Sequence, residues 1–150
     1  MFPTSLSDAT SELSSAAVSA LLGEFTAAFK QADRLLRLHT PLGSNVLLAE
    51  SLKGIECISG AGPASGQWQG SQLAITGYML QIDALSLDAH LELKALIGQP
   101  VLLELQTDQS KSVLRPLHGY VTQAQCIGAN GGMARYRLTV QPWLAFLGHG

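Results

Sequence analysis

Charged residues are scarce in this sequence. Asp, Glu, Lys and Arg make up 13% of its 150 residues, against about 25% in an ordinary globular domain. Nine basic and eleven acidic residues leave a net charge of -2, and the basic ones are scattered, which argues against nucleic-acid binding and a polybasic membrane patch. The hydrophobic share of 47% excludes general disorder. We therefore expect one domain or a piece of a larger one, which is either an oligomer or a fragment, because so few charges leave little with which to cover its surface.

Cysteines, export signals and long apolar runs are equally scarce. Only Cys57 and Cys126 are present, without CxxC spacing, so we expect two reduced thiols, although a single disulfide between them stays open. The first basic residue is Lys30, so the apolar stretch at residues 16–22 lacks the positively charged start of a secretory signal. No uncharged apolar run approaches the roughly 18 residues that would span a bilayer. We expect a soluble protein with no integral membrane segment.

The sequence also lacks a catalytic or metal-binding constellation. None of the four histidines has zinc-type spacing to another ligand; they are His39, His90, His118 and His149. Cys126 and His118 form the one conceivable nucleophile pair, but nothing near Cys126 would lower a thiol pKa. Asp83 and Asp88 flank a turn, where Asp88 is better explained as a helix cap than as an acid or base. From the residues alone we predict no catalytic residues, no cofactor and no metal.

The amino-terminal third begins with a helical pattern. Val18, Leu21, Leu22, Phe25 and Phe29 recur at helical spacing between Thr10 and Gln31, which predicts an amphipathic helix. Its apolar stripe is narrow and contains Gly23. We therefore interpret residues 1–33 as a helical leader and residues 34–150 as the main domain.

From Arg34 onward the apolar period changes to two, which is typical of strands. We predict strands around Leu36–Leu38, Val46–Ile58, Tyr78–Ala84, Val101–Leu105, Leu117–Thr122 and Ala134–Gln141. A Gly-, Ser- and Gln-rich segment at 59–76 reads as a loop or insertion. The fold class is therefore α+β and mainly β: a small barrel-like or rolled antiparallel sheet with one packed helix.

Two local signals refine this prediction. Ser86 or Asp88 would cap a helix that runs from Asp88 to Ile97 and ends at Gly98. Asn130-Gly131 predicts a tight hairpin, because both central positions of such a turn favour positive φ. Leu144–Leu147 is expected to begin a helix or turn.

Two basic residues are the best candidates for contact with a partner. Arg135 and Arg137 alternate with apolar residues, so they share the outward face of one predicted strand. They could bind an acidic partner surface, although the pattern favours an ordinary solvated face.

Several blocks of the sequence occur in the order found in one protein family. They are Arg34–Gly43 (RLLRLHTPLG), Asp83–Leu105 (DALSLDAHLELKALIGQPVLLEL), Arg115–Val121 (RPLHGYV), Ala134–Leu138 (ARYRL) and Gln141–Leu144 (QPWL). On these blocks the sequence resembles VgrG, the spike component of bacterial type VI secretion systems, which is similar to the hub and spike proteins of contractile phage tails. The resemblance spans about three quarters of the chain, from Arg34 to Leu147.

The resemblance implies a function in secretion. It implies a barrel-like phage baseplate hub domain, a homotrimer that docks on the hexameric Hcp tube, contacts with baseplate proteins, and carriage of effectors. It also implies that the shared part is structural and not an enzyme, that the protein is cytoplasmic before firing, and that the type VI machinery exports it without a signal peptide.

The sequence departs from the family in three places. Residues before Gln31 show no resemblance, the segment at 59–76 is richer in Gly and Ala than the connection expected there, and Gly150 comes before the rest of the hub and the needle. We therefore expect a truncated or fragmentary first hub segment of a VgrG-like spike. Two other hypotheses stay open: a non-functional remnant, and a small-barrel binding module or enzyme unrelated to secretion.

Overall fold

The computed structural model describes residues 16–24, 27–57, 77–108 and 110–149. The chain divides into two compact units, Met1–Lys30 and Gln31–Gly150. In the first unit, residues 16–24 and 27–28 are helical, and their described side chains are exposed. The helix predicted for Thr10–Gln31 is therefore present in its central part and ends before Phe29. The predicted loop at 59–76 lies outside the described residues.

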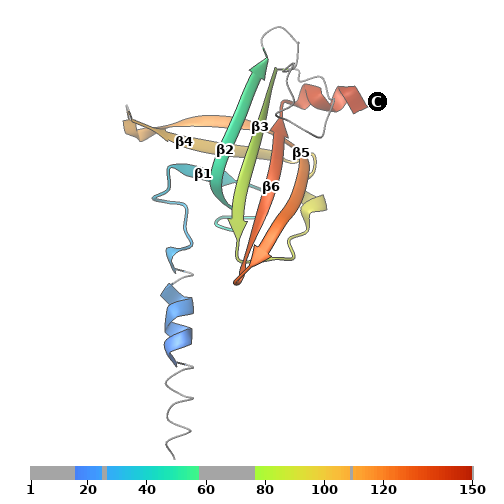
Figure 1. Ribbon diagram of the computed structural model, residues 1–150. Coiled ribbons are helices and arrows are strands. Elements are labelled where there is room, and N and C mark those ends of the chain that lie inside the picture. Colours follow the sequence, from blue (N-terminus) through green and yellow to red (C-terminus); the bar gives the residue numbers. More distant parts are fainter. Residues whose placement is uncertain (1–15, 25–26, 58–76, 109, 150) are drawn as a thin grey trace, which may run out of the picture. The chain divides into compact units, whose positions relative to one another are not determined.

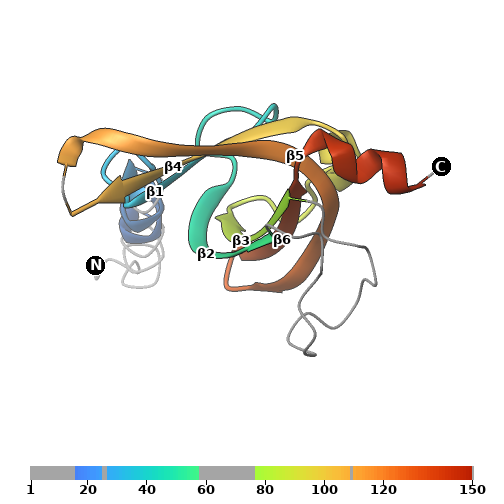
Figure 2. The same cartoon turned by 90° about the horizontal axis from the view of Figure 1, so that it is seen from above.

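In the second unit, the described residues form one antiparallel sheet of six strands, in the order β1-β4-β5-β6-β3-β2 (Figures 1 and 2). All neighbouring strands are antiparallel, as the sequence pattern predicted. The strands are β1 (Leu36–His39), β2 (Leu48–Cys57), β3 (Gly77–Ser86), β4 (Pro100–Thr107), β5 (Ser110–Asn130) and β6 (Met133–Gln141).

The long strand β5 turns this sheet into a curled half-barrel. Its first part pairs with β4 and its second part with β6, and Figure 2 shows it running along β4 and then bending over to β6. The β5–β6 register shifts between Val121 and Gln123 and again between Cys126 and Gly128. Such bulges bend a strand and increase its twist, which lets one strand serve both halves of the sheet.

The hairpin between β5 and β6 is confirmed, one residue later than the sequence indicated. Asn130 pairs with Met133, so the central residues of the turn are Gly131 and Gly132. Their φ angles are 61° and 81°. Glycine adopts such angles without the steric cost of a Cβ, which favours this pair over Asn130-Gly131 as the turn centre.

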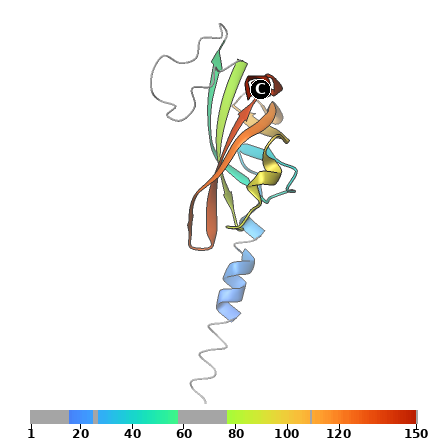
Figure 3. The ribbon, with the colours of Figure 1, turned by 90° about the vertical axis from the view of Figure 1, so that its right-hand side faces the viewer.

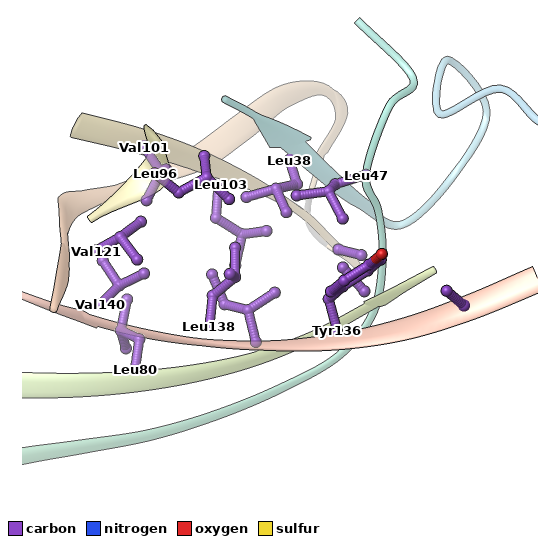
Figure 4. Packing of buried hydrophobic residues seen from close by; sticks show 14 residues of the cluster. Leu38, Leu47, Leu80, Leu96, Val101, Leu103, Val121, Tyr136, Leu138 and Val140 are labelled. Carbon is purple, nitrogen blue, oxygen red and sulfur yellow. The ribbon is translucent and has the colours of Figure 1, made fainter. Parts of the chain in front are cut away.

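The core lies inside the curl of the sheet (Figure 4). Strand β6 contributes most regularly: Ala134, Tyr136, Leu138 and Val140 are buried and alternate with more accessible residues up to Gln141, which is itself buried. The Tyr136 hydroxyl donates a hydrogen bond to the backbone oxygen of Asp88 at 2.8 Å. The other members of the cluster are Leu38, Leu47, Ala49, Leu80, Ile82, Ala84, Leu96, Val101, Leu103 and Val121.

The α-helix predicted for Asp88–Ile97 is wrong in length and type. The structure has a single 3₁₀ turn, η1 (Leu93–Leu96) (Figure 3). Ser86 Oγ accepts from the Asp88 N–H and Asp88 Oδ1 accepts from the His90 N–H. Both side chains thus bond two residues ahead, which forms turns that compete with a helix.

The chain near Gly98 confirms the predicted end of this segment. Gly98 has φ 79°, and its N–H donates to the backbone oxygen of Val121 at 2.8 Å. Leu96 is fully buried whereas Ile97 is 42% exposed. The turn therefore anchors the connection to the sheet through one leucine.

A second 3₁₀ segment, η2 (Trp143–His149), follows β6. The sequence predicted a helix or turn at Leu144–Leu147. The ring of Phe146 meets that of Tyr120 edge-on, with centroids 6.3 Å apart, so η2 lies against β5. Pro142 precedes it, and the Ala145 N–H donates to the Pro142 oxygen.

Candidate interaction surfaces

Two bidentate ion pairs cover the outward side of β6. Arg137 Nε and Nη2 donate to the two carboxylate oxygens of Asp83 at 2.7 and 2.9 Å, and the two residues lie directly opposite each other on β6 and β3. Arg135 Nε and Nη2 donate to Glu50 at 2.7 and 2.8 Å. Because β3 lies between β2 and β6 in the sheet, this second pair reaches across β3.

The two pairs differ in their environment. The hydrogen bond from Arg137 lowers the pKa of Asp83 below its ordinary value of 3.8, against an opposing effect of burial. The Asp83 side chain is only 14% exposed, whereas those of Arg135 and Glu50 are 50% and 36% exposed. The first pair is therefore a fixed part of the sheet, while the second is open to solvent and partners.

The structure thus brings the predicted contact residues, Arg135 and Arg137, onto one face and gives each an acidic partner in the same chain. The sequence did not identify those partners. Glu50 stands at a register shift of the β2–β3 pairing, between Ala49 and Ser51, and is 85 residues from Arg135. Alternation along β6 places the arginines, but it carries no signal for the acid that meets them.

A separate surface is apolar. Trp143 is 58% exposed and Leu147 is 68% exposed on η2, with Leu144 and Phe146 also exposed. Side chains of this size gathered on one short segment are typical of a surface that another polypeptide covers. The sequence indicated this feature through the apolar residues still present in its last stretch.

The groups considered for catalysis are not brought together. His118 and Cys126 lie eight residues apart on the bent strand β5, at most roughly 26 Å along the strand at about 3.3 Å per residue. His118 is opposite Leu102 on β4, whereas Cys126 is opposite Tyr136 on β6. Asp83 is bound to Arg137, and Asp88 accepts from a backbone N–H. Among the described residues, no three His, Cys, Asp or Glu side chains are placed to hold a metal ion.

The strand register shows whether Cys57 and Cys126 can form a disulfide. Cys57 lies opposite Gly77 at one end of β3, while Cys126 lies opposite Tyr136, whose partner on β3 is Ala84. These positions are seven residues apart along β3, roughly 23 Å at about 3.3 Å per residue. Cys126 is a free, exposed thiol, so it is not bonded to Cys57.

Within the described part of the chain, no helix combines the length and apolar character needed to cross a membrane.

Comparison with known proteins decides the family. Residues 73–150, just over half of the chain, match the phage tail baseplate hub (GPD) family. The chain belongs to this family. The half-barrel is therefore a baseplate-hub fold, as the resemblance implied, and the family is a structural one.

The chain is also similar to spike proteins of Pseudomonas aeruginosa. It is 28% identical over 120 residues to type VI secretion system spike protein VgrG1b, which covers 80% of this chain and 14% of that protein. It is 28% identical over 125 residues to VgrG1c, covering 83% of this chain and 15% of that protein. The chain thus spans about 15% of the length of these relatives. The similarity over most of this chain confirms the resemblance to VgrG.

Proposed function

We propose that this baseplate-hub domain is the amino-terminal hub segment of a type VI secretion spike and helps deliver effectors. The similarity to VgrG spike proteins over four fifths of the chain carries the proposal. The chain would act as a structural component and not as an enzyme. The division into a helical leader at 1–33 and a hub segment at 34–150 belongs to the same proposal.

The proposed assembly is a homotrimer that docks on the Hcp tube and contacts baseplate proteins. The apolar side chains of η2 support a subunit interface, because obligate interfaces are more hydrophobic than other surfaces. In this proposal the protein is cytoplasmic before firing and leaves the cell through the type VI machinery without a signal peptide.

Arg135 and Arg137 are the proposed contacts with an acidic partner surface. Arg135 is the stronger of the two, because half of its side chain is exposed and its pair with Glu50 is solvated. Arg135 could therefore leave Glu50 and pair with a carboxylate of the partner at little cost in free energy. Arg137 would act mainly through its fixed pair with Asp83.

The assembly is tested by measuring the mass of the purified full chain in solution and its binding to purified Hcp rings. We expect a trimer of about 48 kDa, three times the 15.9 kDa of one chain. Leu147→Asp should dissociate the trimer, and Arg135→Ala should weaken Hcp binding while leaving the trimer intact. Lys94→Ala, an exposed cation on η1, is the matched control for the charge change.

The mass of the protein as its own cells make it is measured in parallel by immunoblot and intact mass spectrometry. A product much larger than 15.9 kDa would assign the function to a complete spike. A folded monomer that ignores Hcp at every concentration contradicts the proposed assembly. Binding of a dye that detects exposed apolar surface, together with broad proton NMR resonances, would instead indicate an incompletely folded remnant.

A further inference from the structure

A groove of about 680 Å³ lies between the two end strands of the sheet. The strand order places β1 at one end and β2 at the other, and residues 40–47 join the two strands directly. The groove is lined by Asp33, Arg34, Leu35, Leu36, Ala49, Glu50, Leu52 and Leu105. Its volume is within the range of ligand-binding pockets.

The groove is apolar where it meets the core. Leu36 and Leu52 are partly buried and pack against the hydrophobic cluster, and Ala49 is a buried member of it. Leu105, opposite Leu36 in the β1–β4 register, completes this floor. Apolar side chains of an occupant would therefore extend the existing core.

Arg34 lines the groove beside Asp33, but it forms no ion pair with an acidic residue in the described part of the chain. Arg34 is half-buried, and the ion pairs of the described residues are His39–Glu104, Arg135–Glu50 and Arg137–Asp83. Both oxygens of Glu50 are taken by Arg135. A guanidinium beside an apolar floor is best satisfied by a carboxylate, which it binds in a planar, two-pronged geometry.

At the groove, β2 has an edge that another strand can join. Over its ten residues β2 pairs with β3 alone among the described strands, so its other edge has no strand partner in that part of the chain. At the edge of β1, by contrast, the Leu38 N–H is already bound by the side-chain oxygen of Gln31 at 2.8 Å. Strand addition is therefore favoured on the β2 side.

We propose that this groove binds an extended peptide segment of another protein, which adds to the free edge of β2, places apolar side chains on the floor and sets an acidic side chain against Arg34. Main-chain hydrogen bonds would supply affinity and the alternate side chains specificity. The inference does not depend on a role in secretion, because it rests on the groove, the free strand edge and the unpaired cation.

The test uses the full chain and a fluorescein-labelled hexapeptide of alternating valine and threonine with one central glutamate. A second peptide carries glutamine in place of glutamate, and a third is N-methylated at alternate residues to remove its donors. We expect the glutamate peptide to bind about tenfold more tightly than the glutamine peptide. Arg34→Gln should abolish this preference, whereas Lys94→Gln, outside the groove, should retain it.

Amide hydrogen exchange measured by NMR locates the binding. The glutamate peptide should slow exchange along residues 48–57, and the N-methylated peptide should not. Equal affinity for the glutamate and glutamine peptides, or no binding at about 1 mM, overturns the proposal. Protection of 48–57 that rises with protein concentration in the absence of peptide would assign the groove to a second copy of the chain, and would also overturn it. A failed trimer or Hcp assay leaves these peptide measurements unaffected.

Discussion

The side-chain oxygen of Gln31 accepts a hydrogen bond from the backbone N–H of Leu38 at 2.8 Å. Gln31 is buried, and its own N–H donates to Oδ1 of Asn45 at 3.0 Å. A single amide side chain thus takes the place of a neighbouring strand at the edge of β1. The first residue of the second unit thereby links β1 to the connection that leads into β2.

Replacing Gln31 should destabilise the domain. Gln31→Ala leaves the buried Leu38 N–H without an acceptor, which costs about 1–3 kcal/mol in the free energy of unfolding. Urea unfolding followed by circular dichroism measures the change. Gln125→Ala, on an exposed position of β5, is the control and should have little effect. Equal midpoints for the two variants would show that solvent replaces the lost acceptor.

Leu96 should matter far more than its neighbour Ile97. Leu96→Ala removes a fully buried side chain from the core and should cost about 2–5 kcal/mol. Ile97→Ala changes a side chain that is 42% exposed and should cost less than about 1 kcal/mol. Thermal and urea unfolding of both variants gives the comparison. An unchanged midpoint for Leu96→Ala would contradict the packing of η1 on the sheet.

Periodicity predicted the strands well because burial on one face of a sheet imposes a period of two. The alternation of Ala134, Tyr136, Leu138 and Val140 with outward residues is visible in the sequence and reappears as burial in β6. The segment after Ser86 was not predicted in the same way. There the hydrogen bonds of Ser86 and Asp88, and the Tyr136 hydroxyl 48 residues away, determine the backbone.

The candidate surfaces were predictable only in part for a related reason. The positions of Arg135 and Arg137 on one face follow from alternation along a single strand. Their partners depend on which strands become neighbours and on the register shift at Glu50. The groove and the unpaired Arg34 likewise arise from the two ends of a curled sheet, which local sequence does not encode.

Gly119 should be the least replaceable glycine of β5. A Cβ at this position would lie 2.7 Å from Cγ1 of Val140 and 2.9 Å from the backbone oxygen of Gln141. Because backbone cannot move aside easily, Gly119→Ala should cost about 1–3 kcal/mol. Gly128→Ala is the matched control on the same strand, since a Cβ there meets nothing within 4 Å. If chemical denaturation ranks the two variants equally, the close approach of β5 and β6 is not rigid.

The ion pair of Asp83 and Arg137 should make the stability of the folded chain depend on pH. The hydrogen bond from Arg137 lowers the pKa of Asp83 in the folded chain below 3.8, so the unfolded chain binds a proton at this site more readily. The resulting stabilisation is present above the unfolded pKa and is lost as the pH falls through the folded pKa. Asp83→Asn should therefore lower stability by about 1–2 kcal/mol at neutral pH.

The difference in stability between Asp83→Asn and the natural chain should then narrow as the pH falls below the ordinary carboxyl pKa of 3.8, because protonated Asp83 resembles asparagine. Urea unfolding at a series of pH values measures it. Asp108→Asn supplies the control, since Asp108 is exposed and forms no ion pair among the described residues. A gap of constant size from neutral to acidic pH would mean that Asp83 acts through hydrogen-bond geometry alone, and that its charge does not contribute to the stability of the sheet.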